Sequence, residues 1–385
     1  MKIGILTLPL HTNYGGILQA YALQTVLDRM GHEVHVINLD RTPRLYSTTS
    51  VIKHFIIMVL SSIKRHKIYK FYDIRKEDRK RYRDYLIKSK YTQQFIEKYI
   101  HNYWVQNYIS DIVSADFDAI VVGSDQIWSP IHARAIGGVT NAFLPFLTCN
   151  KVRRISYAAS FGKDIWKYSH QDTIIAKQAI KGFTSVSVRE SSGIKLCKDY
   201  LEVEATQQID PTLLLEASDY KSLLKLETVE KSNGNMLVYL IDSSSEKDAI
   251  VDYIENILFM HRFVVNSRAE DYNNKNLKIE DCIQPPVENW LRGFMDADFV
   301  VTDSFHACAF SIIFKKQFVV IGNAERGLTR FQSLMTMLDI NNRIVSSLQE
   351  VMKLDLADII DYNKVDRIIH EQRLKSMCYL KEKLA

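Results

Sequence analysis

Short apolar runs alternate with longer amphipathic stretches along much of the chain. Residues 2–8 and 33–39 form apolar runs that predict buried strands, and residues 17–30 between them carry an apolar stripe at helical spacing that ends at Gly31. A strand, a helix and a second strand in this order predict the start of an α/β domain with a parallel sheet.

The same alternation returns after residue 110 and continues to residue 360. It predicts strands near 119–122, 154–158, 184–188, 236–241, 263–266, 299–302 and 317–321, and helices near 246–260, 287–296, 305–314 and 329–338. We therefore expect an α/β protein of two Rossmann-like domains that face a cleft. The expected parts are an N-terminal domain over 1–215, a C-terminal domain over 216–360, and a helix over 361–385 that can pack back on the N-terminal domain.

Residues 41–110 interrupt this alternation and predict a basic helical insertion in the N-terminal domain. Residues 51–63 are apolar with few charges, whereas residues 64–90 carry twelve Lys/Arg against four Asp/Glu. One interpretation is a helix pair packed on the first domain with a solvated basic face. The other is a peripheral membrane contact through residues 51–90, in which apolar side chains enter the headgroup layer and basic side chains meet anionic lipid.

The composition indicates which ligands, metal sites and cell compartment to expect for this protein. The 385 residues include 50 Lys/Arg and 45 Asp/Glu, a net charge of +5 that favours acidic ligands, and no nucleic-acid-binding motif accompanies it. The five cysteines are widely spaced without a CxxC pair, which predicts reduced thiols and no metal site. Since no signal peptide or membrane-spanning run is recognisable, we expect a cytoplasmic protein, at the inner face of the membrane if residues 51–90 bind lipid.

The segment around His306 is the strongest candidate for chemistry. An apolar run ends at residues 302–303, and Ser304 stands where a helix N-cap is expected. His306 then falls in the first helical turn, close to unpaired backbone N–H groups and the positive end of the helix dipole. Such a place suits a phosphate or carboxylate, and an imidazole there can exchange a proton with the ligand. The alternative is a partly buried histidine with a structural role.

Other polar motifs also follow predicted strands. Asn13, Tyr14, Gly15 and Gly16 form either a ligand-binding loop or a tight turn, and they lack the G-x-G-x-x-G pattern of a nicotinamide site. Asp125, beside Ser124, suits a base or a sugar ligand, or else caps a turn.

Three arginines are expected at the same edge of the sheets. They are Arg189, Arg326 and Arg330, and each could clamp a carboxylate or phosphate with its planar fork. For Arg189, a salt bridge to Glu190 or another neighbour is the competing interpretation. The convergence of these arginines with His306 and Asp125 predicts a site in the cleft.

Taken together, the motifs are similar to those of the polysaccharide pyruvyl transferase family. The resemblance spans nearly the whole chain, with little match over residues 41–110, and Ala307 stands where the family has glycine. The motifs that carry it are residues 13–24, 123–128, 156–162, 188–190, 210–212, 302–306 and 326–331.

The resemblance implies a fold like the GT-B glycosyltransferases and transfer of pyruvate from phosphoenolpyruvate to a sugar as a ketal. Phosphoenolpyruvate is then a donor substrate, and the acceptor is a sugar or a lipid-linked oligosaccharide. We expect no resident cofactor, and no metal cluster is visible in the sequence. His306 is then the expected acid/base, and Asp125 a base or acceptor ligand. The expected substrate-binding residues are Arg189, Arg326, Arg330, Ser304, Asn13, Tyr14, Gly15, Gly16, Ser124 and Ser160.

Two other functions stay open from the sequence. A glycosyltransferase with a nucleotide-sugar donor would need an acid on the ribose, for which Glu280, Asp281 or Glu288 could serve. A non-catalytic member of a polysaccharide-assembly complex would use the basic segment as its contact.

Overall fold

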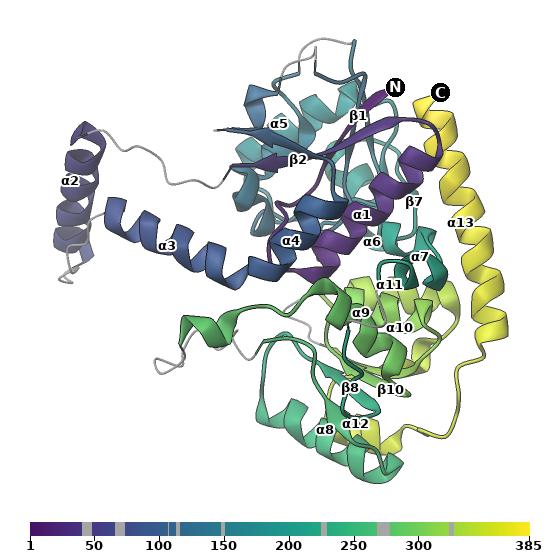
Figure 1. Cartoon of the computed structure of the whole chain (residues 1–385). Coiled ribbons are helices and arrows are strands. Elements are labelled where there is room, and N and C mark those ends of the chain that lie inside the picture. Colours follow the sequence, from purple (N-terminus) through teal and green to yellow (C-terminus); the bar gives the residue numbers. More distant parts are fainter. Residues whose placement is uncertain are drawn as a thin grey trace.

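Two parallel sheets, each covered by helices, form the body of the molecule in the computed structural model (Figure 1). The strands β1 and β2 lie in the upper half of the view, and β8 and β10 lie in the lower half. The predicted α/β class with two Rossmann-like domains is confirmed. The structure describes residues 1–40, 48–65, 74–106, 108–112, 116–147, 151–224, 229–267, 278–322 and 327–385.

The first sheet has the strand order β3-β2-β1-β4-β5, and every pair in it is parallel. Its strands are β1 (Lys2–Leu6), β2 (Glu33–Leu39), β3 (Asn102–Val105), β4 (Ala119–Val122) and β5 (Arg153–Ser156). Apolar residues fill β1 and β4 because both faces of the sheet are covered. β1 and β4 are neighbours, although the chain continues from β1 toward β2 and from β4 toward β5. A topological switch point therefore lies between β1 and β4.

The second sheet has the order β12-β11-β10-β8-β9, again entirely parallel. Its strands are β8 (Met236–Tyr239), β9 (Arg262–Phe263), β10 (Phe299–Thr302), β11 (Gln317–Ile321) and β12 (Ile344–Val345). Here the neighbours whose connections diverge are β8 and β10, so this sheet has its switch point between them. A two-stranded parallel pair, β6 (Ser187–Val188) with β7 (Thr206–Gln207), bridges to the edge of the first sheet beyond β5.

The helices follow the predicted alternation, with differences at their ends. The helix expected over 17–30 starts earlier, at Tyr14, because Asn13 has the extended backbone of an N-cap residue. In the first half of the chain the helices are α1 (Tyr14–Arg29), α4 (Lys90–Tyr99), α5 (His170–Ala179), α6 (Ser191–Leu196) and α7 (Ala217–Lys221). In the second half they are α8 (Ser245–Leu258), α9 (Val287–Asp296), α10 (Phe305–Ile313), α11 (Thr329–Leu338) and α12 (Leu348–Lys353).

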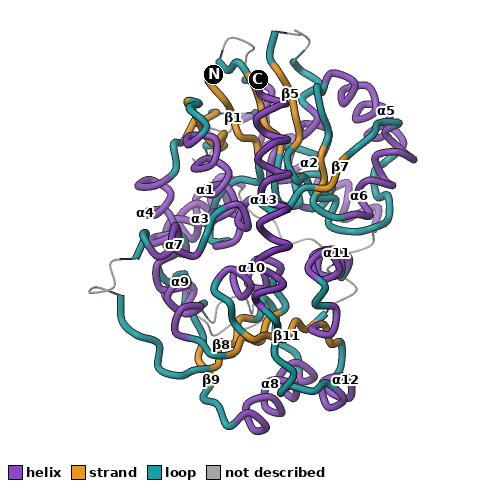
Figure 2. Tube along the Cα trace, turned by 90° about the vertical axis from the view of Figure 1, so that its right-hand side faces the viewer, coloured by secondary structure: helices purple, strands orange, loops and turns teal. Residues whose placement is uncertain are grey.

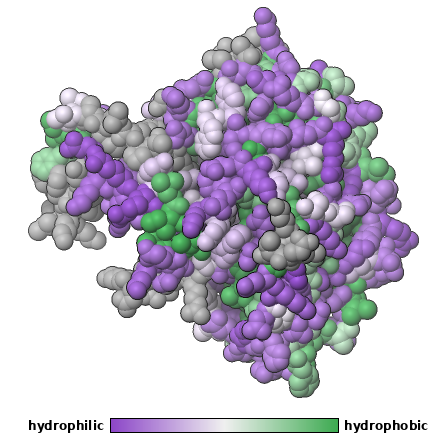
Figure 3. All heavy atoms as spheres, viewed as in Figure 1, coloured by the Kyte–Doolittle hydropathy of each residue, from purple (hydrophilic) through white to green (hydrophobic). Residues whose placement is uncertain are grey.

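The insertion contains α2 (Thr48–Arg65) and α3 (Ile74–Lys88), followed by α4 and by β3, a strand that the sequence pattern did not predict. β3 is a short edge strand of mixed polarity, so it lacks the apolar run that marks a buried strand. α3 extends away from the body, and α2 lies at its far end (Figure 1). Apolar atoms are visible on this projection at the left of Figure 3. No described helix is both long and apolar enough to cross a membrane.

The long helix α13 (Tyr362–Leu384) runs alongside both sheets (Figures 1 and 2). Near its start, the Tyr362 hydroxyl donates to the Lys316 carbonyl, and near its end the Tyr379 hydroxyl donates 2.9 Å to the Ser156 carbonyl at the end of β5. One buried apolar cluster contains residues of both sheets together with α1, α10 and α13. The body of the molecule thus has a core that is continuous from one sheet to the other.

Candidate active site

A cavity of about 660 Å³ lies where the carboxyl ends of the two sheets face each other. Its walls include Leu8 after β1, Asp125 after β4, Ile241 after β8 and His306 after β10. These are the four strands that flank the two switch points, and ligands of open α/β sheets bind in such crevices. The topology therefore delivers chemistry-bearing residues from both domains to one cavity.

His306 lies in the first turn of α10, as predicted. The Ser304 hydroxyl caps this helix by accepting from the Ala307 N–H at 3.4 Å, and the Thr302 hydroxyl accepts from the Ser304 N–H at 3.0 Å. The His306 side chain is 8% exposed and lines the cavity. Its ring packs against Gly15 at the start of α1, where a Cβ would lie 2.5 Å from the His306 Cβ. Only a residue without a side chain lets α1 and α10 approach this closely.

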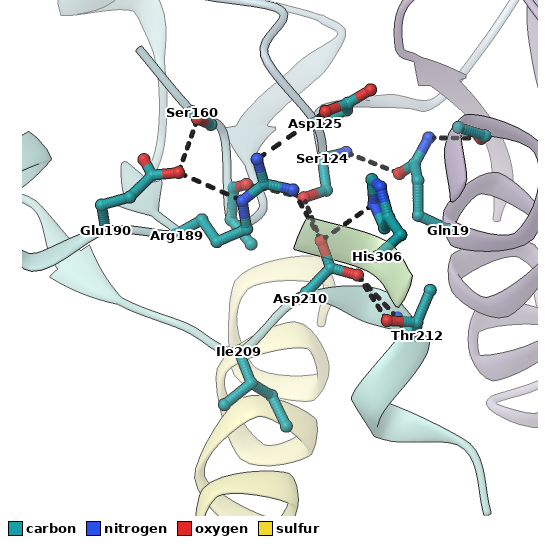
Figure 4. Close-up of polar contacts among 12 residues, drawn as sticks. Gln19, Ser124, Asp125, Ser160, Arg189, Glu190, Ile209, Asp210, Thr212 and His306 are labelled. Carbon is teal, nitrogen blue, oxygen red and sulfur yellow. Dashed lines mark hydrogen bonds and ion pairs between the residues drawn. The ribbon is translucent and has the colours of Figure 1, made fainter. Parts of the chain in front are cut away.

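Asp210 is the carboxylate next to the His306 ring, between Arg189 and Thr212 (Figure 4). Its Oδ2 lies 3.7 Å from the His306 Nε2 and accepts from the Arg189 Nη1 at 2.8 Å. Its Oδ1 accepts from the backbone N–H and the hydroxyl of Thr212. Burial alone would raise the pKa of Asp210, but His306 and Arg189 outweigh it and hold the pKa well below its usual range. Asp210 is therefore an ionised group that fixes its neighbours.

Arg189 has a different place from the one expected for a substrate clamp. Its side chain is 3% exposed, is not among the cavity-lining residues, and faces Asp125, Glu190 and Asp210 at 3.7, 3.2 and 2.8 Å. Burial would lower the pKa of this guanidinium, but the three carboxylates raise it overall. In this structure the fork of Arg189 holds the acidic cluster together, because a buried cation needs such partners.

Asp125 is the acidic residue of this cluster that reaches the cavity. Its backbone is left-handed, with φ +55°, a conformation that aspartate tolerates better than most residues. Burial raises its pKa, but the positive groups His306, Arg189 and Arg330 outweigh this and lower the pKa overall. Asp125 is thus held as a carboxylate in the cavity wall, where it can accept a proton or hydrogen-bond a sugar hydroxyl.

The charged residues in the rest of the cavity wall are mostly basic. Arg330, in the first turn of α11, lines it together with four basic residues that the sequence did not single out, His132, Arg134, Lys163 and Lys167. In addition to Asp125, the cavity wall contains the acidic residue Asp303, which forms an ion pair with the buried Lys247. His132 and Arg134 lie in a short 3-10 helix, His132–Ile136, soon after Asp125, and Lys163 and Lys167 lie in the loop after Gly162. Closeness in sequence to two predicted motifs was therefore the available signal.

The remaining predicted residues fall into two groups. Asn13 lines the cavity together with Asp125, Ser304, His306 and Arg330. Tyr14, Ser124 and Ser160 are buried away from the cavity and donate hydrogen bonds to Pro285 O, Ala158 O and Glu190 Oε1, respectively. The hydroxyls of these three residues therefore form hydrogen bonds within the fold.

Gly15 and Gly16 act through their lack of a side chain. Gly15 gives room to His306, and Gly16 lies beside the Asn13 side chain, with neither in the cavity wall. Arg326 lies outside the described residues. Among the described residues, no group of three or more His, Cys, Asp or Glu is arranged to hold a metal ion.

Chemically, the cavity can hold an anion against its cationic wall, with an imidazole and a carboxylate at one end for proton transfer. His306 and Asp125 are both held by the same buried cluster, so their positions are coupled.

Comparisons with known proteins agree with this fold. A family model described as polysaccharide pyruvyl transferase matches residues 13–325. No curated protein sequence matches the chain. Among solved structures, a candidate UDP-N-acetylglucosamine 2-epimerase from Listeria monocytogenes is similar at 10% identity, with a TM-score of 0.50 over 96% of this chain and 90% of that chain. The UDP-GlcNAc 2-epimerase from Neisseria meningitidis bound to UDP-GlcNAc has 9% identity and a TM-score of 0.46 over 97% and 100%. The first of these shows a shared GT-B-like fold.

Proposed function

Since the chain belongs to the polysaccharide pyruvyl transferase family, we propose that it moves the pyruvate unit of phosphoenolpyruvate onto a sugar of a polysaccharide or its precursor. The product is a ketal and the leaving group is phosphate. The acceptor in this proposal is a sugar or a lipid-linked oligosaccharide, and the donor is a substrate rather than a resident cofactor.

The observation that carries the proposal is the cationic cavity with its acid/base end. Phosphoenolpyruvate carries a phosphate and a carboxylate, and Arg330, Arg134, Lys163 and Lys167 supply positive charge along the wall. Arg330 suits bidentate binding of either group, and the α10 N-terminus adds a favourable dipole. The donor would lie with its phosphate and carboxylate against these groups and its methylene carbon toward His306.

The chemistry needs a proton donor and two hydroxyl nucleophiles. His306 would give its proton to the methylene carbon C3, which turns the C2 of the donor into an electrophile. One sugar hydroxyl then adds to C2 and its proton passes to Asp125 or back to His306. The second hydroxyl displaces phosphate from C2 to close the ketal, and its proton leaves with the phosphate. One proton is consumed and two are released, so His306 is regenerated at the end of the cycle.

The nucleotide-sugar alternative is less well supported by the structure. The acids that it requires, Glu280, Asp281 and Glu288, are not among the residues that line the cavity. The basic residues of the cavity could hold a diphosphate, but these ribose-binding candidates lie elsewhere.

Two measurements test the proposal. In thermal-shift assays, phosphoenolpyruvate should raise Tm more than inorganic phosphate or UDP-sugars, because a ligand that binds only the folded state stabilises it. With phosphoenolpyruvate and a panel of nitrophenyl glycosides, His306→Ala should lower acceptor-dependent phosphate release roughly 10²–10⁴-fold while the donor-induced Tm shift remains. Stabilisation by UDP-sugars alone, or full turnover by His306→Ala, would contradict it.

A further inference from the structure

The helix α2 has an apolar face that the body of the protein does not cover. Ile52, Ile56, Val59 and Leu60 follow the i, i+4, i+7, i+8 spacing of one helical face, and each is 41–59% exposed. None of them belongs to the buried apolar clusters of the described residues. The packed helix pair that the sequence left open is therefore not the arrangement of α2. An exposed apolar helix face of this kind indicates an interaction surface.

The charge of the same region indicates which kind of partner the apolar face of α2 binds. From Thr48 to Arg65 the sequence holds three Lys/Arg and no Asp/Glu, and α3 holds seven Lys/Arg against three Asp/Glu. The two helices thus carry a net charge of +7, more than the +5 of the entire chain, so the remainder is slightly negative. Positive charge is concentrated on the part that projects, whereas a surface built for another copy of this chain would need compensating acidic groups.

We propose that α2 and α3, together the α2–α3 arm, dock the protein on a membrane that contains anionic lipid. The apolar face of α2 lies in the headgroup and acyl boundary, and Lys53 together with the lysines and arginines of α3 lies at the level of the phosphates. An amphipathic helix with a cationic polar face has the composition that lies in the plane of such an interface.

The arm is attached beside the cavity. At the C-terminal end of α3, the Tyr85 ring stacks on the His11 ring with 4.5 Å between centroids, and the Lys88 carbonyl accepts from the Gln284 N–H at 3.0 Å. His11 precedes the cavity residue Asn13, and Gln284 belongs to the second half of the chain. The arm thus contacts both halves of the chain, and its docking would hold both of them near the bilayer. If the proposed function holds, this geometry suits an acceptor that is carried on a lipid.

Neighbouring isoleucines provide a matched test. Ile56 and Ile57 are 50% and 52% exposed, yet they lie 100° apart around the helix, with Ile57 on the side of Lys53 and Ser61. Ile56→Glu and Ile57→Glu make the same change in charge, but only Ile56→Glu removes a side chain from the apolar face. Neither substitution disturbs a buried core, so both variants should keep the Tm of the wild type.

The measurement is co-flotation of the full chain with vesicles of phosphatidylcholine and phosphatidylglycerol, and with phosphatidylcholine alone. Wild type should float with the anionic vesicles only, and less so at high salt. Ile57→Glu should weaken binding roughly fivefold through charge, and Ile56→Glu by about a further tenfold or more through lost insertion. Equal loss in the two variants, or no flotation of wild type, would overturn the proposal.

Binding of a second copy of the chain to the apolar face of α2 would give a different result. If the apolar face pairs with a second copy, wild type will elute as a dimer without lipid and Ile56→Glu as a monomer, which also overturns the proposal. The flotation needs neither phosphoenolpyruvate nor an acceptor. Failure of membrane docking is therefore separable from failure of the proposed reaction, which the donor-induced Tm shift reports.

Discussion

Gly15→Ala should impair catalysis while the protein stays folded, because Gly15 is the residue of α1 that packs against the His306 ring. A Cβ at position 15 would lie 2.5 Å from the His306 Cβ and closer still to the ring, whereas ordinary contact begins at 3.4 Å. The histidine and α1 must therefore separate by at least 0.9 Å, the difference between these distances. His306 would then leave its place beside Asp210 and its position in the cavity wall.

The magnitude follows from this displacement. A misplacement of about 1 Å in a catalytic group costs roughly 10²-fold in rate. Overpacking at a tight helix contact costs about 1–3 kcal/mol, which the better helix propensity of alanine offsets by roughly 0.5–1 kcal/mol. Gly15→Ala should thus lose about 10²-fold or more in turnover and about 1–2 kcal/mol in the free energy of unfolding, so that the protein stays folded.

Gly16→Ala is the matched control. A Cβ at position 16 would lie 3.2 Å from the Asn13 Nδ2, the end of a flexible side chain that can shift by a few tenths of an ångström. Acceptor-dependent phosphate release and urea unfolding should both remain near wild type for this variant. The reasoning is refuted if Gly15→Ala turns over like wild type, or if Gly16→Ala is equally impaired.

Three further predictions concern the charged residues. Asp210→Asn should lower the free energy of unfolding by about 3–5 kcal/mol near neutral pH; because the folded-state pKa of Asp210 is depressed, this difference from wild type should shrink as the pH falls below about 4, in urea unfolding at several pH values. Arg189→Met should lower the Tm strongly, since it leaves three carboxylates without their cation, whereas a substrate clamp would raise KM at unchanged Tm. Lys163→Ala and Lys167→Ala should each raise KM for phosphoenolpyruvate roughly two- to fivefold at little change in kcat, an effect that high salt should abolish in steady-state assays.

The order of strands and helices could be predicted because buried parallel strands leave continuous apolar runs in the sequence. The roles of the charged residues at their ends could not, because these depend on distant partners. Arg189 and Arg330 give the same local signal, yet Arg189 faces Asp210 and Asp125, 21 and 64 positions away, and is removed from the cavity. His306 could be placed from its own helix start, since the cap and the first turn are local features.

Asp210 shows the other limit of prediction from one sequence. Its Asp-Pro-Thr segment is typical of a turn, and the side chain does accept from the Thr212 N–H as in an ordinary cap. The second carboxylate oxygen, however, contacts a residue of the other half of the chain, His306. A local pattern cannot reveal a contact that forms only when two sheets come together.

The apolar core that joins the two sheets has a consequence for how the protein unfolds. Since α1, α10 and α13 contribute to one buried cluster, the two halves share the contacts that would stabilise each of them alone. They should melt together in a single cooperative transition, and a chain cut near the start of the second half should not give two independently stable fragments. The cavity is then lined by a single folding unit, whose opposing walls keep their spacing without relying on a ligand to bring them together.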